Sequence, residues 1–229
     1  MLTPTEIAGR LGEVRDRIAR AEQHSGRRTG SVRLVLASKT QDAAAVRAAY
    51  HAGAREFGEN YVQEAADKRE QVADLLGTTW HLIGHLQTNK AKLATRTFDV
   101  IQTLDSIRLA HAISRAQSAP PARVLVEVNI GGEASKSGVA PDQVEALIES
   151  ARWEVEIAGL MTIPPPAARP AEARRPFAAM RELRDRLAAS TGLALSDLSM
   201  GMTNDFEAAI EEGATIVRVG RAVFGERRR

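Results

Sequence analysis

Short strand-like runs alternate with helical stretches along almost the whole chain. The strongest run, residues 32–40 (VRLVLASKT), is β-branched and Leu-rich without polar alternation, which is typical of a strand buried on both faces of a parallel sheet. Seven further strands are predicted at residues 54–60, 79–85, 98–104, 123–130, within 153–163, at 198–202 and at 215–220. Eight strands that alternate with helices predict an α/β protein whose strands close into a (β/α)8 barrel.

The segments between these strands have helical composition. Predicted helices cover residues 42–52, 61–76, 89–96, 106–116, 141–151, 172–190 and 205–212. A helix over about residues 4–22 precedes the first strand, with Ile7, Leu11 and Val14 at helical spacing, and we expect it to cover the bottom or side of the barrel. An open doubly wound sheet is the alternative, but such sheets usually carry a glycine-rich loop after the first strand, and residues 38–40 contain no glycine.

Length and composition favour one domain that spans residues 1–229, because a chain of this size can bury a complete core. The absence of cysteine excludes disulfides, thiolate metal sites and cysteine nucleophiles. Thirty-one Lys and Arg against twenty-nine Asp and Glu are nearly balanced, which argues against a nucleic-acid groove, and we expect the arginines at 227–229 to form a solvated tail. Without a leader-like segment or an apolar run of about 20 residues, we expect a soluble cytoplasmic protein that does not bind membranes.

Lys39 stands at the end of the first predicted strand. In parallel α/β folds the carboxyl ends of the strands carry the chemistry, and partial burial lowers the pKa of an amine towards that of a useful nucleophile. Such a lysine can form a Schiff base with an aldehyde. The alternative is an ordinary surface lysine at a junction between strand and loop.

A closed barrel would bring the residues after all eight strands to one mouth. Residues 199–205 supply hydroxyls, a glycine backbone and a helix start, and residues 219–221 add amide donors, so these two loops are typical of a phosphate site. Arg218 alternates with Val217 and Val219 and could place a positive charge near a ring or a phosphate. The residues expected at the mouth are Lys39, Asn60, His85, Asn129, Met161, Ser199, Gly201, Thr203, Arg218, Gly220 and Arg221.

Each of these residues also has an ordinary structural explanation. Asn60 could cap the next helix, and Ser199 and Thr203 could be turn and cap residues. His81 and His85 lie on a strand and at its end, which does not match the helical spacing of a zinc pair. The combination of a strand-end lysine with a phosphate site nevertheless points to pyridoxal 5′-phosphate (PLP), an aldehyde that carries a phosphate.

Several long segments resemble the YggS-type pyridoxal phosphate homeostasis proteins. They occur in the same order over nearly the whole chain, at residues 37–40 (ASKT), 57–64 (FGENYVQE), 80–90 (WHLIGHLQTNK), 128–130 (VNI), 135–138 (SKSG), 159–163 (GLMTI), 198–206 (LSMGMTNDF) and 217–221 (VRVGR). The resemblance implies a modified TIM barrel like the N-terminal domain of bacterial alanine racemases, with PLP held as a Schiff base on Lys39.

The resemblance also implies the other cofactor-binding residues. Ser199, Gly201 and Thr203, with the backbone of Gly220 and Arg221, are expected to hold the phosphate. Arg218 is expected to face the pyridine nitrogen and keep it unprotonated, Asn60 and Met161 to lie beside the ring, and Lys136 to receive or pass on the cofactor. Thr203 replaces the serine that the family more often has, and the Pro- and Ala-rich residues 164–175 leave the shape of that loop open.

Three functions fit these residues. Racemases of the related fold have a second, β-rich domain, and we expect no room for it in a chain that ends at Arg229. Those racemases also use a catalytic tyrosine from a partner subunit. Tyr50 and Tyr61 are the only tyrosines here and Tyr61 is expected to pack at a helix start, so we expect neither to act as the acid or base. The first hypothesis is a monomeric, non-enzymatic protein that carries and buffers PLP, with PLP-dependent apoenzymes as possible partners. The second is a monomeric PLP-dependent amino-acid racemase. The third is a barrel that forms a Schiff base with a sugar phosphate, as aldolases do.

Overall fold

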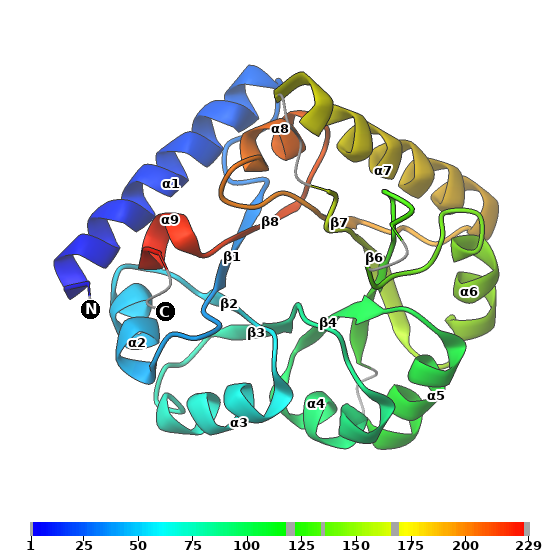
Figure 1. Ribbon diagram of the computed structural model, residues 1–229, viewed down its shortest axis with the longest axis horizontal. Coiled ribbons are helices and arrows are strands. Elements are labelled where there is room, and N and C mark those ends of the chain that lie inside the picture. Colours follow the sequence, from blue (N-terminus) through cyan, green and yellow to red (C-terminus); the bar gives the residue numbers. More distant parts are fainter. Residues whose placement is uncertain (1, 118–121, 134–135, 166–169, 227–229) are drawn as a thin grey trace.

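The computed structural model describes residues 2–117, 122–133, 136–165 and 170–226. Eight parallel strands close into a barrel in which each strand pairs with the next and β8 pairs with β1 (Figure 1). The predicted (β/α)8 barrel is therefore confirmed. The strands are β1 (Arg33–Ala37), β2 (Glu56–Glu59), β3 (Thr79–Leu82), β4 (Val100–Leu104), β5 (Arg123–Glu127), β6 (Glu156–Met161), β7 (Asp197–Ser199) and β8 (Ile216–Val219).

Helices surround the barrel (Figure 1). They are α1 (Pro4–His24), α2 (Ala43–His51), α3 (Val62–Gln71), the 3-10 turn η1 (Thr88–Lys90), α4 (Ala91–Thr97), α5 (Ile107–Ala116), α6 (Val144–Ala151), α7 (Pro170–Thr191), α8 (Phe206–Glu211) and α9 (Arg221–Phe224). Asp42 and Ser106 cap α2 and α5 through their side chains, so these two predicted starts are correct to one residue. The four-residue α9 was not predicted, because so short a helix shows no periodicity. Within the described segments, no helix is both long and apolar enough to cross a membrane.

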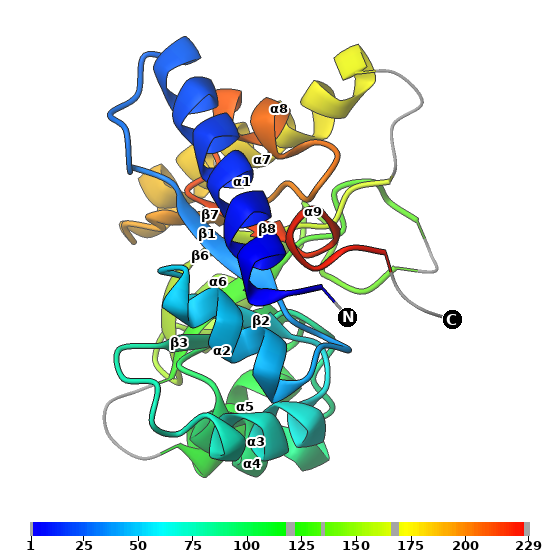
Figure 2. The same ribbon diagram turned by 90° about the vertical axis from the view of Figure 1, so that its left-hand side faces the viewer.

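The first helix lies on the side of the barrel. A capping box between Thr3 and Glu6, with Pro4 in the first turn, starts α1 where the sequence predicts it. Figures 1 and 2 show α1 along the outside of the barrel, where it packs against α2 and α8. Of the two predicted locations, bottom or side, the structure confirms the side.

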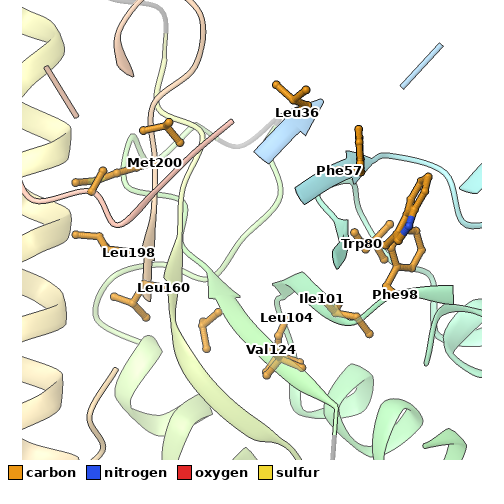
Figure 3. Close-up of a cluster of buried hydrophobic side chains, with 14 of the residues drawn as sticks. Leu36, Phe57, Trp80, Phe98, Ile101, Leu104, Val124, Leu160, Leu198 and Met200 are labelled. Carbon is orange, nitrogen blue, oxygen red and sulfur yellow. The ribbon is translucent and has the colours of Figure 1, made fainter. Parts of the chain in front are cut away.

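Side chains of the strands divide into an outer and an inner core. Figure 3 shows part of the outer core, in which Phe57 and Trp80 pack with ring centroids 5.6 Å apart. The inner core is a separate cluster inside the barrel, consisting of Val35, Leu125, Ala158, Met161 and Ile216. Because successive side chains of a strand alternate between its faces, a residue two positions after an inner-core residue also faces the interior.

The amino ends of the strands carry a set of ion pairs that we call the barrel floor. Asp197 accepts from Arg33 at 2.8 Å and from Arg123 at 3.0 Å, and Arg123 also pairs with Glu156 at 2.6 Å. Glu56 lies 3.9 Å from Arg33. Each arginine of the floor therefore has a carboxylate partner, and each carboxylate has an arginine partner. Such pairing is typical of the amino end of a (β/α)8 barrel, which contributes to stability and does not carry the active site.

Candidate functional site

The carboxyl ends of the strands form the opposite end of the barrel, which we call the mouth. Lys39 lies there, half-buried, in a turn that begins after β1 ends at Ala37. The predicted strand was too long by three residues, because Thr40 adopts a left-handed backbone conformation with φ of 67° that no strand can continue. A non-glycine residue in this conformation is strained, and such strain is common next to functional residues.

Buried polar contacts anchor the turn that carries Lys39. The carbonyl of Ser38 accepts hydrogen bonds from Lys68 Nζ and from the Gln41 amide, both at 2.9 Å. Lys68 Nζ also donates to Glu59 Oε1 at 2.6 Å, and the Ser38 hydroxyl donates to the same oxygen at 2.7 Å. Burial raises the pKa of Glu59, and the charge of Lys68 opposes this shift. The residue before Lys39 is thus tied to both β2 and α3.

Arg218 is buried in the barrel beneath the mouth. It lies two residues after Ile216 of the inner core, so its side chain faces inward, as predicted from its alternation with two valines. Its Nη1 donates to the Ser199 hydroxyl at 2.6 Å and its Nη2 donates to the Thr162 carbonyl at 2.7 Å. Burial lowers the pKa of Arg218 to about 10, although the charges of Glu127 and Asp205 raise it in part, so Arg218 stays charged at neutral pH.

A chain of hydrogen bonds connects Arg218 to the floor. The Ser199 hydroxyl donates to Gln102 Oε1 at 2.7 Å, and Gln102 Nε2 lies 2.9 Å from His81 Nδ1. Because Gln102 Nε2 is a donor, His81 Nδ1 must accept, and His81 Nε2 then donates to Glu56 Oε2 at 3.0 Å. This network runs from β8 through β7, β4 and β3 to β2. His85 takes no part in this network and pairs with Asp105 at 3.3 Å, so the two histidines considered above have different partners.

Asn60 follows β2 directly and is half-buried at the mouth. Its Oδ1 is buried and has no hydrogen-bond partner among the described residues. The residue that caps α3 is Tyr61, so Asn60 does not serve as the helix cap. A Cβ at Gly84 would lie 2.4 Å from the Asn60 carbonyl oxygen, so only a glycine allows the loop after β3 to pack against Asn60.

The loop after β7 forms a tight turn at the mouth. Gly201 has φ of 92°, and its carbonyl accepts from the Arg218 amide at 3.0 Å. Asp205 Oδ1 accepts from the Met202 amide at 2.6 Å and closes a turn in which Thr203 is half-buried. Burial raises the pKa of Asp205, against the effect of that hydrogen bond.

The loop after β8 reaches the Lys39 turn from the other side. A Cβ at Gly220 would lie 2.9 Å from the Ala37 carbonyl oxygen, so this glycine allows the start of α9 to approach the end of β1. The side chain of Arg221 is exposed and lies 3.8 Å from Glu226. It borders a cavity of about 720 Å³ between α1, α2 and α9, outside the barrel. The backbone of Arg221, more than its side chain, is therefore the part near the mouth.

Two more predicted residues lie around the same opening. Met161 ends β6, is fully buried and belongs to the inner core beneath the mouth. Lys136 pairs with Glu133 at 2.6 Å and donates to the Ile163 carbonyl at 3.5 Å, so it joins the loops after β5 and β6. Ser135, the arginines at 227–229 and residues 166–169 of the Pro- and Ala-rich loop lie outside the described residues.

Glu127 was not singled out from the sequence. It ends β5, is 7% exposed, and faces the interior because it lies two residues after Leu125 of the inner core. Burial raises its pKa to about 7, the charge of Asp105 adds to this effect, and the charge of Arg218 opposes it. The available signal was a lone carboxylate at the end of an otherwise apolar strand.

Comparison with known proteins assigns this barrel to a family. The model of the alanine racemase N-terminal domain family matches residues 10–228. A relative from Pseudomonas aeruginosa, named pyridoxal phosphate homeostasis protein, is 45% identical over 225 residues, which cover 96% of each chain. The chain belongs to the pyridoxal phosphate homeostasis protein family.

Solved structures are similar to this member of the pyridoxal phosphate homeostasis protein family over most of its length. The structure of PipY from Synechococcus elongatus with PLP bound has a TM-score of 0.82 and 36% identity, and the match covers 96% of this chain and all of PipY. Alanine racemase from Corynebacterium glutamicum has a TM-score of 0.70 at 19% identity, and the match covers 97% of this chain and 61% of the racemase. At that identity the racemase shows a shared fold alone.

In this pyridoxal phosphate homeostasis family member, the predicted site residues all lie at or just beneath the mouth. Some of their polar groups already have a partner within the protein. Arg218 donates to the Ser199 hydroxyl, and Lys136 pairs with Glu133. The direct contacts predicted between these residues and a cofactor stay predictions. Sequence reasoning missed three residues around Arg218. The charge of Glu127 acts on Arg218, the Thr162 carbonyl accepts from it, and Gln102 accepts from the Ser199 hydroxyl that Arg218 also contacts.

Proposed function

We propose that this protein binds PLP in the barrel mouth and that, as a carrier and buffer of the cofactor, it maintains PLP and amino-acid homeostasis in the cytoplasm. The observation that carries the proposal is the pairing of an anchored, half-buried Lys39 with buried polar atoms that lack partners among the described residues, namely Asn60 Oδ1 and Glu127 Oε2. A buried polar atom without a partner is rare in a folded protein, and a bound ligand is one way to satisfy it. PLP is bound in the related PipY structure.

The residues at the mouth fit this cofactor. PLP supplies an aldehyde that can bond to a lysine amine, together with an anionic phosphate. Lys39 would hold the aldehyde as a Schiff base, and the permanent charge of Arg218 would face the pyridine nitrogen and disfavour its protonation. Asn60 and Met161 would lie beside the ring.

The turn of Gly201 and Thr203, with the backbone of Gly220 and Arg221, would hold the phosphate on the β7 and β8 side of the mouth. Ser199 would support this site indirectly. Its hydroxyl donates to Gln102 and accepts from Arg218, so a direct bond to phosphate would have to compete with the Arg218 contact. Lys136, at the edge of the mouth, would receive or pass on the cofactor, with PLP-dependent apoenzymes as recipients, and we propose that the carrier is a monomer.

The bond to Lys39 is tested by trapping. The purified protein, loaded with PLP, should show the absorbance of a PLP Schiff base, and borohydride reduction should fix the label on the peptide that contains Lys39. The Lys39→Ala variant should lose this absorbance and the label. Lys92→Ala, an exposed lysine on α4, is the matched control and should load like the parent. A Lys39→Ala variant that stays fully labelled at another lysine would refute the assignment.

A carrier and a racemase differ in one measurable reaction. When the loaded protein is incubated with L-alanine in deuterium oxide, the α-proton should exchange no faster than in the protein-free PLP control. Exchange at an enzymatic rate, lost in Lys39→Ala, would support the racemase instead. A colourless protein that binds a sugar phosphate and no PLP would support the third hypothesis.

A further inference from the structure

Gln102 is a fully buried polar side chain in the middle of β4 that the proposed cofactor contacts leave unused. Its Oε1 accepts from the Ser199 hydroxyl at 2.7 Å, and its Nε2 lies 2.9 Å from His81 Nδ1. In the closed barrel, β5 and β6 lie between β4 and β7, so the bond from Gln102 to Ser199 crosses the barrel interior. Gln102 therefore connects two strands that do not pair with each other.

A glutamine at this position has a cost that an apolar side chain of the same size would not have. A buried amide loses its hydrogen bonds to water and needs partners within the protein instead. Both polar atoms of the Gln102 side chain have such a partner. A buried network whose members are all satisfied is rigid, so Gln102 holds the Ser199 hydroxyl in one position.

The guanidinium of Arg218 has two acceptors, and they differ in how firmly they are fixed. Its Nη2 donates to the carbonyl of Thr162, a residue whose amide donates to the Ser199 carbonyl at 3.1 Å, so this acceptor is held by the backbone. Its Nη1 donates to the Ser199 hydroxyl. A serine side chain can adopt other rotamers, and its one proton can point in several directions. Gln102 Oε1 takes that proton and leaves the lone pairs of the hydroxyl oxygen to Arg218.

We propose that Gln102 is a positioning residue for PLP. By holding the Ser199 hydroxyl, it fixes the plane of the Arg218 guanidinium and so the charge that Arg218 presents to the pyridine nitrogen. This inference rests on the proposed function, in which Arg218 faces that nitrogen, and Gln102 itself does not touch the cofactor. While the bond to Gln102 stands, the Ser199 hydroxyl has no proton left for the phosphate of bound PLP.

Substitution of Gln102 tests the proposal through the pyridine nitrogen. Gln102→Met removes both hydrogen bonds of the amide and nearly keeps the length of the side chain. Thr191→Val is the matched control, because Thr191 is also buried and its hydroxyl donates to the Leu187 carbonyl at 2.7 Å, at the end of α7. Each protein is loaded with PLP that is isotope-labelled at the pyridine nitrogen, and the NMR shift of that nitrogen is measured. This shift responds to a charge or a donor at the nitrogen, and a loss of stability that leaves the protein folded does not change it.

We expect the shift of the ring nitrogen to change in Gln102→Met and to equal that of the parent in Thr191→Val. The effect should act through Ser199. In a Ser199→Ala background, Gln102→Met should therefore cause little further change, since the two substitutions break the same connection.

A second measurement observes Arg218 in the protein without PLP. In an arginine-labelled sample, the Nη signals of Arg218 are identified by their loss in Arg218→Lys. Held between Ser199 and Thr162, the guanidinium should turn slowly about its Nε–Cζ bond, and its two Nη signals should exchange faster in Gln102→Met. If Gln102→Met does not fold, Gln102→Asn replaces it in both measurements, because a side chain shorter by one methylene cannot reach both partners.

A ring-nitrogen shift in the Gln102 variant that equals the shift in the parent would overturn the inference and leave the proposed function intact. A change of the same size in the Ser199→Ala background would also overturn it, because Gln102 would then act independently of Ser199. Equal exchange of the Arg218 signals in the parent and the variant would contradict the fixed guanidinium. A parent protein that takes up no PLP would overturn both the inference and the proposed function.

Discussion

The two ends of the barrel interior are both polar, but they treat their charges differently. At the floor, Arg33 and Arg123 share Asp197, and Arg123 also pairs with Glu156. At the mouth, the buried side-chain oxygens that lack a hydrogen-bond partner in the described structure all belong to residues at the ends of β2 and β5 and in the loop after β5. Two of these residues, Glu59 and Glu133, have an ion-pair partner in Lys68 and Lys136. Asn60 Oδ1 and Glu127 Oε2 are buried polar atoms that a ligand could satisfy, in agreement with the binding proposed for the mouth.

The same comparison predicts how strongly each end responds to substitution. Arg33 and Arg123 of the floor keep 36% of their side-chain surface exposed, so water screens their ion pairs. Glu59 and Arg218 of the mouth are buried, so removing a partner leaves a charge without compensation. We therefore expect larger effects at the mouth than at the floor.

The largest effect is expected for Lys68→Met. This variant leaves the fully buried Glu59 without its cation and the Ser38 carbonyl without one donor, and we expect it to lower the free energy of unfolding by about 3–5 kcal/mol. Urea denaturation at neutral pH measures this loss. The double variant with Glu59→Gln should recover part of it, and a single variant as stable as the parent would show that the pair does not anchor the Lys39 turn.

The next effect is expected for Glu127→Gln and depends on pH. Because the folded protein holds the proton of Glu127 up to about pH 7 while the unfolded chain releases it near 4.5, the free energy of unfolding decreases as the pH rises between these values. At pH 8 the variant avoids a buried charge and should be more stable than the parent by about 3 kcal/mol, with little difference near pH 4. Denaturation curves at both pH values check the sign, and a stabilisation that is equal at both would contradict it.

A smaller effect is expected for Ser199→Ala. The substitution removes one of the two acceptors of Arg218 and the donor to Gln102, which should lower the free energy of unfolding by about 1–3 kcal/mol. The absorbance of bound PLP should shift as well, because Arg218 loses part of its alignment. Thr203→Ala is the comparison, since a phosphate contact predicts weaker PLP binding for that variant with little loss of stability.

The smallest effect is expected at the floor, for Arg123→Met. Asp197 keeps its ion pair with Arg33 at 2.8 Å, and Glu156 is half-exposed, so we expect a loss of about 1 kcal/mol or less. The affinity for PLP should equal that of the parent. A large decrease in affinity would show that the floor and the mouth are coupled through the chain of hydrogen bonds from Glu56 to Arg218.

The sequence predicted the elements better than their ends. The segments at 32–40 and 79–85 are strands, as predicted, but both predictions run on past Ala37 and Leu82. The reason is physical, because the last residues of each segment leave the sheet to form the mouth, where Lys39 and Gly84 are needed in turns and close contacts. Local composition does not distinguish a strand from the extended residues that follow it.

The candidate site was predicted in outline. Lys39, Arg218 and Asn60 could be placed at the mouth, because a parallel barrel brings all strand ends to one face. The hydrogen bonds of Ser199 to Gln102 and of Gln102 to His81 could not be predicted, since they join residues that are 97 and 21 positions apart in the chain. The expectation that Ser199 helps to hold the phosphate was made without knowledge of this network, and it stays a prediction.

By itself the sequence determined which residues can be strands, which faces of those strands are apolar, and that a lysine ends the first of them, because hydrophobic periodicity and turn chemistry are local properties. The tertiary structure alone decided which polar groups have partners. Burial and pairing depend on side chains that arrive from other strands when the barrel closes. For that reason Asp197 is satisfied at one end of the barrel, whereas Glu127 Oε2 at the other end has no hydrogen-bond partner among the described residues.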